Sequence, residues 1–238
     1  MVAYHNDREL KERLPAEMTE HSQAIIHGRA SSDWGAEYER YETDYGIPER
    51  LTRLAEAIIG LPLFLAAIPV GADLSLVWPR FALWLLVDSH NGLKSNKGAG
   101  EGVAGIVDDE QLRLIIYRIA GLMAQWISTE VPPMTGRMPE GDAKKILVAA
   151  RAAKEVWAAS PFPLSVMYSE RHNQGVAHRA TVHAAETVFF VAAAMHDPTA
   201  TAKAFKAAEN ASGSARFAGV ATEKLLQLLA TAPKDRRD

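Results

Sequence analysis

The sequence predicts an all-α protein, a single multi-helix domain with an alanine-rich helical bundle in its C-terminal part. Apolar residues recur at helical spacing through most segments between prolines and glycines, strand-like alternation is rare, and alanine dominates the second half. A chain of 238 residues suits one large domain over 1–238. Two halves within it, 1–129 and 140–232, are joined by a linker that contains three prolines.

The first strong helical signal is a run of aromatic residues at intervals of four, three and four. This spacing places them on one face of a helix, and they are Trp34, Tyr38, Tyr41 and Tyr45. Gly46 is expected to end that helix, and Pro48 suits the first turn of the next, which runs until Gly60 and Pro62.

A turn at 69–72 and an N-cap at Asp73 open the next apolar segment, 74–87. Within it, the residues FALWLLVD at 81–88 fit a helix and a buried strand equally well. The glycine-rich stretch Asp88 to Gly105 is predicted to be a flexible surface loop.

Asp108 is predicted to cap a helix whose apolar face runs from Leu112 to Ile127. In a single domain, this helix should contact both 74–87 and 176–191. Further helices are expected at 142–159, 173–195, 199–210 and 214–230. Alanine adds little radius to a helix, so these helices should pack as a tight antiparallel hairpin or small bundle.

Three segments carry a resemblance to a known family: YGIPERLTRLAEAIIGLP (45–62), AIPVGADLSLVWPRFALWLLVD (67–88) and ATEKLLQLLATAP (221–233). In this order, across most of the chain, they resemble an uncharacterised family of bacterial and phage-borne, alanine-rich helical proteins, some of them labelled immunity proteins. Many relatives carry paired cysteines before the YGIP segment, whereas this chain has no cysteine. The resemblance implies a helical fold and no settled reaction.

Composition excludes several classes of function. The 26 basic and 29 acidic residues leave a net charge of −3, which does not favour nucleic acid or anionic lipid as a partner. Without cysteine there is no disulfide, thiolate zinc site or iron–sulfur cluster. The longest apolar run, 58–77, is broken by proline, glycine and aspartate, unlike a membrane span. The polar N-terminus does not resemble a signal peptide, so we expect a cytoplasmic protein.

The aromatic face of the first helix is the candidate protein-binding surface, since tyrosine and tryptophan are favoured at interfaces. Its neighbours would form an acidic rim suited to a basic partner, and they are Asp33, Glu37, Glu39, Glu42 and Asp44. The alternative is that these rings dock the helix onto the core.

A second candidate is a metal site formed by His172, His178, His183 and Glu186. His178 and His183 are five residues apart and diverge on a helix, so the site needs a ligand from elsewhere, such as Asp88 or His90. The simpler interpretation is a charge-paired polar stripe that also includes Arg179.

The glycine loop contains a formal G-x-G-x-x-G pattern at 100–105, but it lacks the preceding strand and the directly following helix of a dinucleotide site. Asp88, Ser89 and His90 are adjacent in sequence and do not encode a catalytic triad. No cofactor is predicted.

These patterns favour a non-enzymatic helical protein that binds another protein, as an immunity or inhibitor protein would. The alternative is a metal-dependent enzyme or metal-binding protein that uses the histidine region. A homo-oligomer that pairs through its alanine-rich helices is a third hypothesis.

Overall fold

The computed structural model describes residues 34–87, 102–107, 109–128, 138, 140–158, 172–214 and 216–234, excluding the side chains of 34–37, 156–158 and 172–177. Within these ranges the regular structure is helical, and Ala72 and Lys234 form an isolated antiparallel bridge. The predicted all-α fold is confirmed. The helices are α3 (Trp34–Tyr45), α4 (Glu49–Ile58), α5 (Leu61–Ala67), α6 (Val77–Val87), α7 (Glu110–Ser128), α8 (Glu140–Ala158), α9 (His172–Ala193), α10 (Ala200–Ser212) and α11 (Phe217–Ala230).

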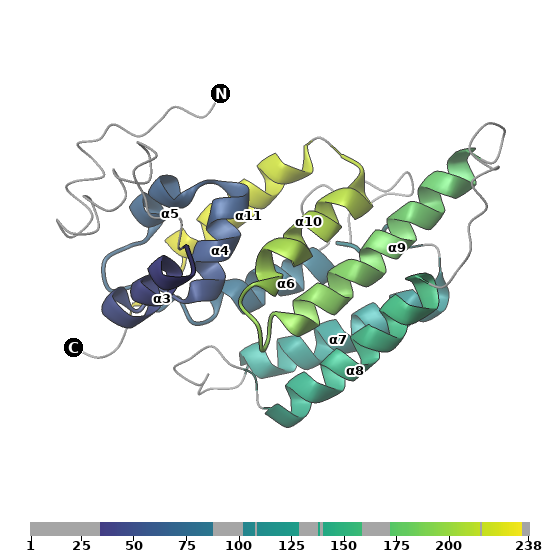
Figure 1. Ribbon diagram of the computed structural model, residues 1–238, viewed down its shortest axis with the longest axis horizontal. Helices are drawn as coiled ribbons and strands as arrows, with labels where there is room; N and C mark the ends of the chain where they lie inside the picture. The colour runs from purple at the N-terminus through teal and green to yellow at the C-terminus, as the bar shows by residue number, and fades with distance from the viewer. Residues whose placement is uncertain are drawn as a thin grey trace.

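The alanine-rich helices form the most extensive packing in the molecule. Figure 1 shows α9 between α8 and α10, with the three helices running in alternate directions. Both α9 and α10 carry small buried side chains, among them Ala184, Ala185, Ala192, Ala200, Ala204, Ala208 and Ala211. This arrangement confirms the predicted antiparallel bundle, because side chains of this size let helix backbones approach closely.

The N-terminal helices enclose a core of larger side chains. Phe64, Phe81, Leu51 and Leu54 are fully buried among α4, α5 and α6. The last helix, α11, returns to pack on α5 and α6 (Figure 1). Its Phe217 ring lies between two others, with ring centroids 6.0 Å from Trp84 of α6 and 5.7 Å from Phe205 of α10. The aromatic stack thereby joins both halves of the chain in one hydrophobic core.

Helix α7 carries the predicted apolar face, with Leu112, Ile116, Ile119, Met123 and Trp126 buried. It packs on α6, as expected, and its main partner in the second half of the chain is α8. Any contact of α7 with the described part of 176–191 is slight beside its packing on α6 and α8.

Two predicted helix starts are displaced by short turns. The Leu112 N–H donates to Asp109 Oδ1 at 2.7 Å, so Asp109 caps α7, whereas Asp108 lies outside the described residues. Asp73 accepts a hydrogen bond from the Ser75 N–H at 2.9 Å, which closes a turn before α6 begins at Val77. The ambiguous segment 81–87 is helical.

The glycine-rich stretch is not a surface loop throughout. Val103 and Ala104 are fully buried, and their N–H groups donate to Leu85 O at 2.9 Å and Leu86 O at 3.1 Å. These bonds satisfy carbonyls at the end of α6 that have no partner within the helix. The prediction of a flexible surface loop is wrong for 102–105, because this part completes the end of α6, and residues 88–101 lie outside the described ranges.

Gly102 is required for this close approach. It has φ +58°, and a Cβ atom built there would lie 2.5 Å from the Leu86 carbonyl carbon and 2.7 Å from Leu85 O. Both are backbone atoms that cannot rotate away.

No helix in the described part of the chain has the length and apolar character needed to cross a membrane.

Candidate functional site

The aromatic face of α3 points into the molecule. Tyr38 is 3% exposed and Tyr41 is 2% exposed, both within the hydrophobic core, and Tyr45 is partly buried with its ring centroid 6.1 Å from that of Tyr41. The side chain of Trp34 lies outside the described residues. The burial of Tyr38 and Tyr41 fits the alternative interpretation, in which these rings dock the helix onto the core, and α3 packs on α4.

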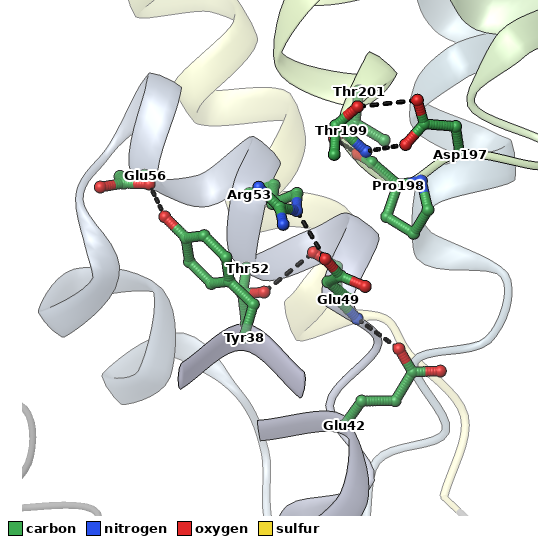
Figure 2. Close-up of polar contacts among 10 residues, drawn as sticks. All are labelled: Tyr38, Glu42, Glu49, Thr52, Arg53, Glu56, Asp197, Pro198, Thr199 and Thr201. Atoms are coloured by element: carbon green, nitrogen blue, oxygen red, sulfur yellow. Dashed lines mark hydrogen bonds and ion pairs between the residues drawn. The ribbon is translucent and has the colours of Figure 1, made fainter. Parts of the chain in front are cut away.

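Polar contacts at the edge of this packing fasten α3 to α4, as Figure 2 shows. The Tyr38 hydroxyl donates to a Glu56 carboxylate oxygen, and the Arg53 guanidinium lies 4.5 Å from the centroid of the Tyr38 ring. Arg53 Nε also pairs with Glu49 Oε1 at 2.7 Å, and the Glu49 N–H donates to Glu42 Oε2 at 3.1 Å. Partial burial disfavours the charged carboxylate and raises the pKa of Glu56.

Acidic side chains surround the exposed part of α3. Glu39, Glu42 and Asp44 are exposed at different angles around the helix, and we call these three residues the acidic face. The other two members of the predicted acidic rim, Asp33 and the Glu37 side chain, lie outside the described residues. Asp44 pairs with Arg40 at 3.1 Å, in an exposed contact that contributes little to stability. Glu39 forms no ion pair with any residue in the described ranges, so the acidic face keeps a net negative charge.

A buried arginine joins α4 to the end of α9. Arg50 is 7% exposed, and it donates from Nε to Ala194 O at 2.8 Å and from Nη2 to Met195 O at 3.2 Å. The C-terminal end of a helix carries partial negative charge and carbonyls without helical partners, which a guanidinium satisfies well. This role was not predicted from the sequence, where the only signal was a charge on the turn before Leu54 in an otherwise apolar face.

The turn between α9 and α10 places Asp197 near the same junction (Figure 2). Asp197 accepts hydrogen bonds from the Thr199 hydroxyl at 2.8 Å and the Thr199 N–H at 2.9 Å. The hydroxyl contact contributes most to lowering the pKa of Asp197, and the charges of Lys203 and Arg53 lower it further. Arg53 thus acts electrostatically across the boundary between α4 and the alanine-rich helices.

The histidine region contains one close pair. His183 Nδ1 lies 2.8 Å from Glu186 Oε2, and both side chains are about one-third exposed on α9. His178 lies five residues earlier on the same helix, hence on a different face. The side chain of His172 and the residues Asp88 and His90 lie outside the described parts.

Among the side chains that the structure describes, no three histidine, cysteine, aspartate or glutamate residues lie close enough together to hold a metal ion. Of the predicted metal ligands, the structure brings His183 and Glu186 together and places His178 on a different face of α9, and a site that includes His172 stays a prediction. The contact of His183 with Glu186 fits the alternative interpretation, a charge-paired polar stripe.

Large apolar side chains that were not predicted to be exposed lie on the surface of α7 and α8. Leu114 is 61% exposed, Tyr117 is 41% exposed and Val148 is 62% exposed. Leu114 and Tyr117 lie one turn apart on α7, on the side opposite Leu112 and Ile116. The signal in the sequence was their position outside the periodic apolar face.

No protein-family model, curated protein or solved structure matches this chain. Its function must therefore be inferred from the surfaces and contacts of the chain itself.

Proposed function

We propose that this protein acts without catalysis, in the cytoplasm, by binding another protein that has a basic surface. The binding surface is the acidic face of α3. The observation that carries the proposal is that Tyr38 and Tyr41 bury one side of this helix, whereas Glu39, Glu42 and Asp44 are exposed around the rest of it. An immunity or inhibitor protein, the label carried by part of the resembling family, would act in this way.

The contacts behind the acidic face support this proposal. Tyr38, Arg53 and Glu49 hold α3 against α4, so the carboxylates stand on a helix whose position is already set. A preformed surface loses less conformational freedom on binding than a flexible one. Complementary charge accelerates encounter and selects the partner, while like charges reject others.

The experiment is affinity capture of the tagged full chain from its host, with captured proteins identified and quantified. The variant Glu39→Lys/Glu42→Lys reverses the charge of the face and should reduce the captured partner by about tenfold or more, as expected for the loss of complementary charge. Capture should also weaken as salt concentration increases.

A matched control is Glu155→Lys/Glu223→Lys, which changes the net charge equally on α8 and α11, away from α3. This control should retain the partner, and circular dichroism of both double variants confirms that they are folded. Equal retention by both double variants, or equal loss from both, would contradict binding through α3.

A further inference from the structure

A second surface, on α7, combines exposed apolar residues with opposite charges. Leu114 and Tyr117 are 61% and 41% exposed, and Glu110, Gln111 and Arg118 are also exposed. We call these five residues the α7 face. In the described parts of the chain, neither Glu110 nor Arg118 forms an ion pair.

The positions of the α7 face are symmetric about Leu114, and the charged residues on its two sides have opposite signs. Glu110 precedes Leu114 by four residues and Arg118 follows it by four. Four residues make slightly more than one helical turn, so the acid and the base lie one turn to either side of the leucine on the same side of the helix. Gln111 and Tyr117 are related in the same way, three residues before and after it.

We infer that α7 binds α7 of a second copy of this chain, with the two helices antiparallel and Leu114 on the two-fold axis. In this register each Glu110 lies opposite Arg118 of the other copy, which gives two ion pairs at the ends of the contact. The two Leu114 side chains meet at its centre, and each Tyr117 covers Gln111 of the other copy. A two-fold interface requires such a self-complementary surface.

The neighbouring helix shows why self-pairing belongs to α7. Val148 of α8 is 62% exposed, nearly the same as Leu114. However, the residues three positions before and after Val148 are Lys145 and Arg151, which are exposed and carry the same charge. An antiparallel copy centred on Val148 would bring these like charges together, which disfavours that pairing.

This inference does not depend on the proposed binding through α3. Figure 1 places α3 and α7 in different parts of the molecule, and α3 packs on α4 whereas α7 packs on α6 and α8. A dimer formed through α7 would carry two acidic faces, one on each chain, and would therefore have two binding surfaces for the partner.

Sedimentation equilibrium of the full chain over a range of concentrations tests the inference. The wild-type chain should form a reversible dimer. Leu114→Glu should raise its dissociation constant by about tenfold or more, because the substitution enters the interface twice. Val148→Glu, which adds the same charge at an equally exposed position, should leave the dissociation constant unchanged.

Charge exchange tests the register itself. Glu110→Arg alone and Arg118→Glu alone should each weaken the dimer, because each places like charges opposite one another. An equimolar mixture of the two variants should form a heterodimer. In that heterodimer the two introduced side chains, which have opposite charges, face each other, and the native Arg118 of one chain faces the native Glu110 of the other. Circular dichroism confirms that each variant is folded.

A wild-type chain that remains monomeric at every concentration overturns the inference. It is equally overturned if Val148→Glu weakens the dimer as much as Leu114→Glu, or if the charge-exchanged mixture fails to associate.

Discussion

The helices α4, α5 and α6 pack in the opposite way to the helices α8, α9 and α10. The first group fills its interior with large side chains such as Phe64, Phe81 and Leu54, which are fully buried. The second group uses alanines such as Ala185 and Ala204, so its helices lie close together with little side-chain volume between them. The first group is therefore stabilised by large side chains that fill its core, and the second by small side chains that let its helices approach closely.

The two groups are held together by larger and more polar contacts. Phe205 of α10 and Trp84 of α6 both stack on Phe217 of α11, and Arg50 of α4 caps the end of α9. Close helix approach thus organises the bundle internally, whereas large side chains and a buried guanidinium connect it to the rest of the fold.

Removing volume from the first group should have the largest effect. Phe81 is fully buried between the rings of Trp78 and Trp84, with centroids 6.5 Å and 5.4 Å away. Phe81→Ala should lower the free energy of unfolding by about 3–5 kcal/mol, because it leaves a cavity. Chemical denaturation measures this loss, and a change below about 1 kcal/mol, typical of surface sites, would contradict the packing described.

Adding one methyl group at Gly102, where two backbone segments lie in close contact, should reduce stability by nearly as much. Gly102→Ala should destabilise the chain by about 3 kcal/mol, since it combines an unfavourable φ with contacts to the end of α6. Gly219→Ala is the control, because its Cβ would meet open space on α11 and should stabilise the helix by up to about 1 kcal/mol. Thermal denaturation of both variants should show shifts of opposite sign.

Removing the Arg50 hydrogen bonds that connect the two groups should cause the next largest loss of stability. Arg50→Met keeps most of the side-chain length but leaves Ala194 O and Met195 O without their donor. We expect a loss of about 2–3 kcal/mol in chemical denaturation, the range for a hydrogen bond to a charged group. Arg50→Lys should recover only part of it, because an ammonium lacks the planar fork of donors. Full recovery by lysine would show that charge alone matters there.

Adding volume to the second group should cost less than removing it from the first. Ala204 is fully buried on α10, and Ala204→Leu should force α10 away from the helices on which it packs, at a cost of about 1–3 kcal/mol. Ala152→Leu, at an exposed position of α8, should be close to neutral. Urea denaturation of the pair measures the difference, and equal effects of the two substitutions would contradict the close packing of the alanine-rich helices.

The smallest loss of stability is expected at the ionised Asp197, in the turn between α9 and α10. The hydrogen bond from the Thr199 hydroxyl, aided by other contacts, holds its folded pKa below the ordinary value of 3.8. Its stabilisation is therefore present above that value and is lost as the pH falls through the lower folded pKa. Asp197→Asn should cost less than about 1 kcal/mol near neutral pH, as for exposed charged groups. The difference from the wild-type chain should vanish in strong acid, which denaturation at several pH values measures.

Glu56 supplies the control of opposite sign for this pH series. Burial raises its folded pKa above the ordinary value of 4.5, so the folded state is favoured below that value and loses this contribution as the pH rises through the folded pKa. Relative to Glu56→Gln, the wild-type chain should therefore gain stability on acidification, whereas relative to Asp197→Asn it should lose stability.

Most helices could be predicted from local patterns, and the errors have either a local or a tertiary cause. The periodicity of Leu112, Ile116 and Met123 predicts α7, because a helix with one buried side is enough to bury all three residues. The cap was assigned to Asp108 and is formed by Asp109, since two adjacent aspartates offer the same chemistry one residue apart. The burial of Val103 and Ala104 could not be predicted, because their partners are carbonyls at the end of another helix.

For the candidate surfaces as well, the sequence indicates the side of a helix on which a residue lies, whereas its burial depends on packing. Spacing correctly placed Tyr38 and Tyr41 on one side of α3, but only the packing of α4 against that side decides that they are buried. Conversely, spacing places Leu114 outside the periodic apolar face of α7, but only the arrangement of α6 and α8 around α7 decides that it is exposed.

By itself, the sequence determined the helical class, the faces of the individual helices and the small size of the residues between α9 and α10, since these depend on neighbours within a few turns. Only the tertiary structure decided which faces are buried, that Arg50 caps α9, and that α7 presents a leucine between opposite charges. These outcomes depend on groups far apart in the sequence, whose meeting no local spacing encodes.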